Sequence, residues 1–377
     1  MTEHIGARLR AAREAAGVSL SAMARLTNYS RYHLSNVEAG RRRATPDVVL
    51  AYERALDRGD ASRRTLLTGL PSGVVAPLVL AEVLHSAFTE ALTARVPVDE
   101  WWTRAEAYGR DYMTVGAAEL SARLVKDMVL LTQHVDDDTV WAPAARLMTV
   151  YGKTLPAYSG GGGAVQWYRL AADLAERSAD LATRVWVRGR AALALAYEAA
   201  ELPCARALAR KALALAGDTP SLGRLNAVVA LAHVAGAEGD AGTAVELMER
   251  AEREFDLVGS HDQISDYAVP EWRFWTFASM LFSRLGDQPR AEHAQEAADR
   301  ARPATLPRFA THIELHRGLM LARAGDRAGG VAHAQAALAR LPAAKRSRSL
   351  RLMMAEIERS GRPADAVSRR PAGRPAG

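Results

Sequence analysis

Cysteine and long apolar runs are nearly absent from this chain of 377 residues. Its single cysteine, Cys204, has no second thiol for an internal disulfide and cannot by itself build a thiolate metal site. No run of about eighteen apolar residues occurs, which argues against a membrane-spanning helix. The first residues, Met1–Ile5, lack the basic start and apolar core of a secretory signal. We therefore expect a cytoplasmic protein that does not enter a membrane.

Lysine, isoleucine and asparagine are also scarce, whereas alanine, leucine and arginine dominate the composition. A chain rich in helix formers and short of β-branched residues is predicted to be all-α. Charge is unevenly distributed: residues 1–68 carry a net charge of +5 and residues 343–377 carry +6, whereas the residues between them carry −5. A small basic module attached to a mildly acidic body indicates that the N-terminal end is built for a polyanion.

Sequence signatures of common enzymes are missing as well. The chain contains no His-Glu-x-x-His, Gly-x-Ser-x-Gly, phosphate loop or dinucleotide fingerprint. The acidic run Asp136–Asp138 and the pair His261-Asp262 have no companions at the spacing of metal ligands. We therefore expect no catalytic residue, no cofactor and no metal site.

Residues 1–58 have the pattern of a compact helical module. Apolar residues recur at helical spacing and predict four or five short helices. Ser30 is positioned to cap the third of these, over Arg31–Glu38. Leu34 and Val37 give that helix an inner face, so its polar residues are expected on the outer face. Short helices joined by a tight link predict a helix-turn-helix domain.

The stretches Leu9–Leu20, Met23-Ala24 and Leu34–Arg42 resemble the Xre family of phage-repressor-type DNA-binding domains. The resemblance covers residues 4–58 and implies a third helix that enters the major groove of DNA, usually as half of a dimer. It also implies that Arg13 pairs with Glu38 in a structural role.

The third helix and its cap supply the candidates for contact with DNA bases: Ser30, Arg31, Tyr32, Ser35 and Asn36. Arg31 can donate two hydrogen bonds to guanine, and Asn36 can pair with adenine. The arginines Arg41, Arg42 and Arg43 follow the helix directly and are candidates for phosphate contacts. A solvated charge run is the alternative for these three, but the adjacent reading helix favours phosphate contact.

The body of the chain repeats a small motif. The dipeptide Gly-Asp follows an apolar segment three times, and a small residue lies five positions after each glycine, at Ala244, Ala291 and Gly330. Earlier units align at Ala205 and Ala164. Small residues are needed where two antiparallel helices cross closely, and Gly-Asp suits the sharp turn between them. The pattern predicts a stack of helical hairpins that share one apolar seam.

Trp275, Phe282 and Gly286-Asp287 occur in the arrangement of a tetratricopeptide repeat. Residues 140–342 therefore resemble about five degenerate repeats of that family, and we predict an α-solenoid over 78–342, which begins with one or two further hairpins. A linker is predicted over 59–77. Residues 343–377 are predicted to be a basic end with a disordered tail.

The first helix of each hairpin is expected to line the concave side of the solenoid. Projecting helical spacing from the small residues gives these groove positions: Arg190, Tyr197, Asn226, His233, Arg273, Phe277, Met280, His312 and His316. Together they fit a peptide or a carboxylate-bearing small ligand. Extra residues between two units form Ser260–Tyr267, which is predicted to be an inert loop or a loop that contacts ligand or partner.

An Xre-type head joined to a tetratricopeptide-like body is similar to bacterial regulators, including those of actinobacteria and the peptide-responsive quorum-sensing receptors. That resemblance implies a homodimer that binds a double-stranded DNA operator and responds to a peptide or small-molecule effector. A second hypothesis is a scaffold, in which the helical body binds a protein partner rather than a diffusible ligand.

Overall fold

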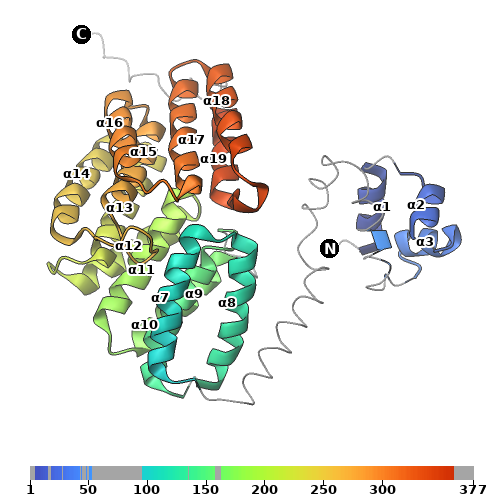
Figure 1. The fold of residues 1–377 in the computed structure, drawn as a ribbon, viewed down its shortest axis with the longest axis horizontal. Helices are drawn as coiled ribbons and strands as arrows, with labels where there is room; N and C mark the ends of the chain where they lie inside the picture. The colour runs from blue at the N-terminus through green and yellow to red at the C-terminus, as the bar shows by residue number, and fades with distance from the viewer. Residues whose placement is uncertain are drawn as a thin grey trace, which may run out of the picture. The chain divides into compact units, whose positions relative to one another are not determined.

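The computed structural model describes residues 5–15, 18–27, 29–42, 44, 48, 51–52, 96–134, 136–157 and 163–360. The chain divides into two compact units, Met1–Ser86 and Ala87–Gly377. Every regular element within the described ranges is helical, so the all-α prediction is confirmed (Figure 1). No helix in this part of the chain has the length and apolar character needed to cross a membrane. The predicted linker, 59–77, lies outside the described residues.

Within its described residues, the first unit, the head, packs the helices α1 (Ile5–Ala15), α2 (Leu20–Thr27) and α3 (Arg31–Glu38). Its core consists of Leu9, Met23, Leu34, Val37, Val48 and Tyr52. Helices α1 and α3 approach so closely that a Cβ atom on Gly6 would lie 1.9 Å from the backbone oxygen of Val37. The third helix has the bounds that the sequence predicts.

The second unit, the body, is a series of helical hairpins. Its helices are α7 (Val98–Thr114), α8 (Ala117–Leu131), α9 (Trp141–Gly152), α10 (Ala164–Arg177), α11 (Leu181–Tyr197), α12 (Leu202–Ala216), α13 (Leu222–Ala237), α14 (Ala241–Val258), α15 (Glu271–Leu285), α16 (Gln288–Ala301), α17 (Pro307–Arg323), α18 (Arg327–Arg340) and α19 (Arg348–Arg359). Three 3-10 turns join some of them: η1 (Thr132–His134), η2 (Asp138–Val140) and η3 (Ala343–Lys345). Consecutive helices from α9 to α18 pair into the five predicted hairpins, and successive hairpins pack on one another (Figure 1).

The Gly-Asp dipeptides form the hairpin turns, as predicted. Gly239, Gly286 and Gly325 have positive φ angles of 87°, 73° and 106°, which glycine adopts without steric cost. The aspartate that follows each glycine caps the next helix: the Asp240 carboxylate, for example, accepts a hydrogen bond from the Thr243 backbone N–H at 3.0 Å. One dipeptide therefore ends one helix and begins the next.

The small residues of the repeat lie at the helix crossings. Ala205, Ala244 and Ala291 are fully buried. In the last hairpin the backbones of α17 and α18 nearly touch, because a Cβ on Gly330 would lie 2.4 Å from the backbone oxygen of Gly318. These positions sit on the seam between hairpins that the sequence predicts.

The helical body continues beyond Pro342, where the sequence analysis placed its end. Helix α19 packs on α17 and α18, and it buries Leu350, Met353, Met354 and Ile357. Burial contributes roughly 1.5–3 kcal/mol for each such side chain. The prediction of a separate basic end from residue 343 is therefore wrong for 343–360; residues 361–377 lie outside the described residues.

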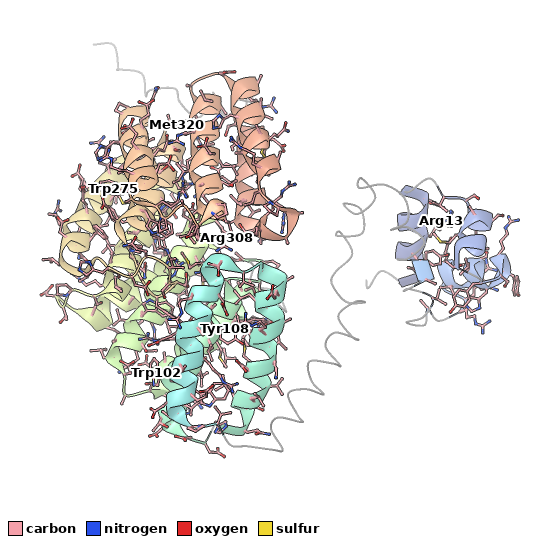
Figure 2. The ribbon with its side chains drawn as sticks, in the orientation of Figure 1. Arg13, Trp102, Tyr108, Trp275, Arg308 and Met320 are labelled. Atoms are coloured by element: carbon pink, nitrogen blue, oxygen red, sulfur yellow. The ribbon has the colours of Figure 1, made fainter. Side chains whose placement is uncertain are left out.

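The two ends of the hairpin series meet. The turn η3 packs against α8, and the backbone oxygen of Ala344 lies against Gly116 at the start of α8. Arg308, labelled in Figure 2, lies at the start of α17. It donates a hydrogen bond to the backbone oxygen of Tyr112 in α7. These contacts close the body around an internal cavity.

Candidate nucleic-acid interface and effector cavity

Helix α3 presents an apolar face to the head and a polar face to solvent. Leu34 and Val37 are fully buried, whereas the Tyr32 side chain is 80% exposed. Arg31 and Ser35 are exposed on the same outer face as Tyr32. The predicted base-reading residues are therefore accessible to a ligand, and the helix itself is held by its buried face.

The first turn of α3 is fixed by a capping hydrogen bond. The Ser30 hydroxyl oxygen accepts a hydrogen bond from the His33 backbone N–H at 3.1 Å. One of its two acceptor positions is therefore occupied by the helix. Asn36 is half-buried near the other end, and its backbone oxygen accepts from the N–H groups of Arg41 and Arg42 at 2.9 and 3.0 Å.

Arg41 and Arg42 are exposed, with no carboxylate paired to them in the described part of the chain. The turn at the end of α3 thus places two guanidinium groups at the end of the helix that also carries Arg31. Such an arrangement suits contacts with phosphates on either side of a groove. Arg43 lies outside the described residues.

A buried ion pair holds α3 against α1. Arg13 donates from Nε and Nη2 to the two carboxylate oxygens of Glu38, at 2.7 and 2.8 Å. The Tyr52 hydroxyl donates to the same carboxylate at 2.8 Å, and burial raises the pKa of Tyr52. Arg13 also donates to the Val18 backbone oxygen. The predicted structural role of Arg13 and Glu38 is confirmed.

The body contains a cavity enclosed by both ends of the hairpin series. Its wall draws on α7, α8, α10, α11, α15 and α17, together with the segment after α9 and the start of α19. Its volume is about 110 Å³ for the centres of water-sized molecules, and about 1050 Å³ when all space between the atoms and the open solvent at the mouth are included. Five of the nine predicted groove residues line it: Arg190, Tyr197, Arg273, Phe277 and His312.

The remaining four lie outside the cavity wall, which corrects their placement. Met280 is fully buried in the core around α17 to α19, and Asn226 and His233 are buried within α13. Helix α13 packs directly against α11 and α15, so those neighbours cover the face that was expected to be open. His316 is fully buried one turn behind His312.

His316 nevertheless connects to the cavity wall through hydrogen bonds. Its Nδ1 lies 2.8 Å from the Ser279 hydroxyl, and its Nε2 lies 3.1 Å from the Tyr197 hydroxyl. The same hydroxyl lies 3.3 Å from Nδ1 of His312. Burial lowers the pKa of His312 to about 3, and Arg308 adds to this effect. A chain of neutral polar groups thus leads from the cavity into the core.

A buried cluster of charges at the cavity wall was not predicted from the sequence. Asp266 has a fully buried side chain, and its Oδ1 oxygen lies 2.9 Å from Nη2 of Arg190 and 2.5 Å from Nη2 of Arg273. Lys153 forms a third ion pair with the same oxygen. Asp266 belongs to the loop Ser260–Tyr267, so the second half of this loop, where Ser265 and Asp266 are buried, is an interior element of the body, whereas its first half is largely exposed.

Burial and the surrounding cations control the protonation of this cluster. Burial alone raises the pKa of Asp266, but Arg190, Lys153 and Arg273 outweigh it and hold that pKa well below its usual value. Burial lowers the pKa of Lys153 well below its usual value, and the charge of Arg190 lowers it further. The carboxylate is therefore ionised at neutral pH.

Arg308 is the fourth cation beside the cluster, and no sequence pattern pointed to it. Its guanidinium lies over the rings of Tyr112 and Phe309, at 5.2 and 4.9 Å from the ring centroids. Such contacts stabilise a cation without neutralising it. Among the described residues no carboxylate pairs with Arg308.

Metal chemistry has no evident site in this part of the protein. The described residues contain no group of three or more His, Cys, Asp or Glu side chains placed to hold a metal ion. Cys204 is half-buried on α12, and burial raises the pKa of its thiol.

Comparison with known proteins supports the assignment of the head. Residues 4–66 match the family model described as a helix-turn-helix domain. The head contains a helix-turn-helix domain. No curated protein matches the chain. Among solved structures, the chain is similar to the crystal structure of Bacillus thuringiensis PlcR in complex with the peptide PapR7 and DNA, at 14% identity and a TM-score of 0.35, over 68% of this chain and 95% of that one.

Proposed function

We propose that this protein is a sequence-specific transcription regulator, with an Xre-type head that binds a DNA operator and a helical body that binds an effector. The observation that carries the proposal is the outer face of α3 within a helix-turn-helix domain, where Arg31, Tyr32 and Ser35 are exposed and Arg41 and Arg42 follow. A helix of this kind reads base edges in the major groove, and flanking arginines bind phosphates.

The regulator acts as a homodimer in this proposal, because helix-turn-helix domains usually read palindromic half-sites about 34 Å apart. The effector is a peptide or a small molecule bound in the cavity of the body. Its binding shifts the population of body conformations and with it the spacing of the two heads. In this proposal the regulator acts in the cytoplasm, and its function requires neither catalysis nor a cofactor.

The first experiment is genomic footprinting of the tagged protein in its native cells, followed by binding of the enriched sequence at two salt concentrations. A short palindrome bound far more tightly than random DNA is the expected result. Binding that falls equally with salt for every sequence would contradict sequence-specific recognition.

Two arginine variants test the roles within the head. Arg31→Ala should reduce discrimination at one base pair by about 1–3 kcal/mol, because a bidentate contact to guanine is lost. Arg42→Ala should weaken binding to all sequences alike and make the salt dependence less steep. Electrophoretic mobility shifts on the enriched site and its single-base variants measure both effects. Identical behaviour of the two variants would contradict base reading by α3.

The scaffold hypothesis is tested separately by native mass spectrometry of the purified protein. An enclosed cavity that several helices line favours a diffusible ligand over a flat protein surface. A co-purified peptide or metabolite supports the sensor. The scaffold is supported by two results together: the cavity is empty, and a protein co-purifies that no small molecule displaces.

A further inference from the structure

The cavity of the body carries more positive than negative charge. Among the described residues, five cationic side chains line it: Lys153, Arg190, Arg273, Arg308 and Arg348. Two carboxylates oppose them, Glu198 in the wall and Asp266 directly behind it. The formal surplus is positive even when Lys153 is neutral. Buried charge without a counter-charge is costly, so this surplus marks a place where an anion would stabilise the protein.

The pairing within the cluster shows which cations are left without a counter-charge. Asp266 forms ion pairs with Lys153, Arg190 and Arg273 through one oxygen, Oδ1. The three cations therefore share one negative charge. The Nε group of Arg190 is buried with no hydrogen-bond partner in the described structure. At the mouth, Arg348 lies 3.7 Å from Glu198, so the second carboxylate is already occupied.

Arg308 is the cation best placed to bind a ligand. Arg308 is 9% exposed and lines the cavity. Within the described residues its one hydrogen bond runs from Nη2 to the Tyr112 backbone oxygen. The aromatic rings of Tyr112 and Phe309 hold the guanidinium in place but contribute no negative charge. The planar guanidinium can still donate to a carboxylate or phosphate with two parallel N–H groups.

Apolar side chains line the cavity together with these cations. Leu155, Leu193, Ala194 and Phe277 belong to its wall. A ligand that fits both kinds of lining has an anionic group and an apolar part.

We propose that the cavity binds an organic anion, either a carboxylate or a phosphate monoester, whose anionic group pairs with Arg308 and Arg190 and whose apolar part packs on Leu193 and Phe277. This inference rests on the proposed function in one respect: the anion is the chemical class of the effector. The binding site itself is independent of what the head does.

The test uses the full chain and three matched probes: phenylacetate, phenyl phosphate and the uncharged phenylacetamide. Isothermal titration calorimetry at constant ionic strength, in a buffer free of phosphate and carboxylates, measures each affinity. We expect saturable binding of at least one anion at millimolar concentrations, at least about tenfold tighter than the amide, since charge-assisted hydrogen bonds are lost with the amide. Tighter binding of phenylacetate identifies a carboxylate ligand, and tighter binding of phenyl phosphate identifies a phosphate ligand.

Variants locate the binding in the cavity. Arg308→Gln should weaken anion binding by about tenfold or more and leave amide binding unchanged, whereas Arg308→Lys should retain part of the preference for the anion. Arg210→Gln is the matched control, because Arg210 is exposed on α12 and does not line the cavity. Circular dichroism checks that each variant keeps its helical content.

Several results overturn the inference: no saturable binding of either anion, equal affinity for the amide, or equal loss of binding in the Arg308 and Arg210 variants. Operator binding measured on the same samples separates this inference from the proposed function. Specific DNA binding without an anion site refutes only the inference. An anion site that leaves DNA affinity unchanged supports the site and contradicts the effector role.

Discussion

At the scale of single residues, the head depends on one buried ion pair. Arg13 and Glu38 join α1 to α3 through two short hydrogen bonds, and Tyr52 adds a third to the same carboxylate. A bidentate pair fixes the orientation of both side chains as well as their separation. Because α3 carries the candidate base-reading residues, this pair positions the DNA-facing surface although it is buried beneath that surface.

Glu38→Ala should therefore destabilise the head by about 3–5 kcal/mol, since it leaves the Arg13 guanidinium buried without its counter-charge. Hydrogen exchange of the α1 and α3 amides, measured by mass spectrometry, reports this change locally. The control is Glu14→Ala, because the Glu14 side chain is 52% exposed, both in its pair with Arg10 and in its longer contact with Arg13 at 3.4 Å. That variant should leave the stability of the head almost unchanged, because exposed ion pairs contribute little. Equal exchange in both variants would show that the buried pair is dispensable.

At the scale of elements, the turn between α11 and α12 departs from the rule that the three Gly-Asp turns follow. After α11 the chain has Ala199 with a φ of 51°, at the place where Gly239, Gly286 and Gly325 follow their helices. The hydrogen bond from the next N–H to the carbonyl five residues earlier is the same in all four turns, for example Ala200 to Leu195 at 3.0 Å. This is the helix-ending motif that favours glycine, so alanine is strained there.

Ala199→Gly should stabilise the body by roughly 1 kcal/mol, because glycine removes the steric cost of the left-handed conformation. The reciprocal variant, Gly286→Ala, should destabilise the body by a similar amount. Urea denaturation followed by tryptophan fluorescence measures both, since all seven tryptophans lie between Trp101 and Trp275. If Ala199→Gly lowered the free energy of unfolding, the contacts of the Ala199 methyl group would contribute more free energy than the backbone strain costs.

The elements also show what could be read from the sequence. Gly-Asp turns, helix caps and small residues at crossings are local patterns with a strong physical cause, and they predicted five hairpins and α3 correctly. Helix α19 was missed because Lys345 and Arg346 before it, and Arg348 and Arg351 in its first half, resemble a solvated tail, although Leu350 and Met353 give the helix a buried face.

The cavity was only half predictable for a different reason. Helical spacing within one hairpin finds Arg190 and Arg273, but Lys153 and Asp266 meet across 113 residues of sequence. Such a contact depends on how the two ends of the series close, and no local pattern encodes that closure. The same limit explains Asn226 and His233, whose inner face is covered by the neighbouring helices rather than left open.

At the scale of the whole molecule, closure of the body buries histidines that cannot be charged there. Burial lowers the pKa of His233 and of His312 to about 3, with smaller effects from Arg284 and Arg308 respectively. Burial also lowers the pKa of His316 well below its usual value. In the unfolded chain each titrates near 6.5, so the unfolded state binds more protons between these values.

The sign of the pH dependence follows from that difference. Above about pH 6.5 the three histidines are neutral in both the folded and the unfolded state and cost no stability. As the pH falls toward 3, the unfolded state binds protons that the folded state does not, so the free energy of unfolding decreases. At pH 5 the loss is about 2 kcal/mol each for His233 and His312, from about 1.36 kcal/mol per pH unit. Asp266 does not contribute in this window, because its pKa is held well below 3.8. Glu198 acts in the opposite direction, since burial raises its pKa.

The body should thus be markedly less stable at pH 5 than at pH 7.5. Urea denaturation midpoints at the two pH values, followed by tryptophan fluorescence, measure this difference. His233→Leu should reduce that difference by about 2 kcal/mol, because it removes one group that must be deprotonated to fold. His261→Leu is the control, since His261 is exposed and should leave the difference unchanged. If His233→Leu kept the full pH dependence, the acid sensitivity would arise elsewhere, and the burial of His233 would not contribute to it.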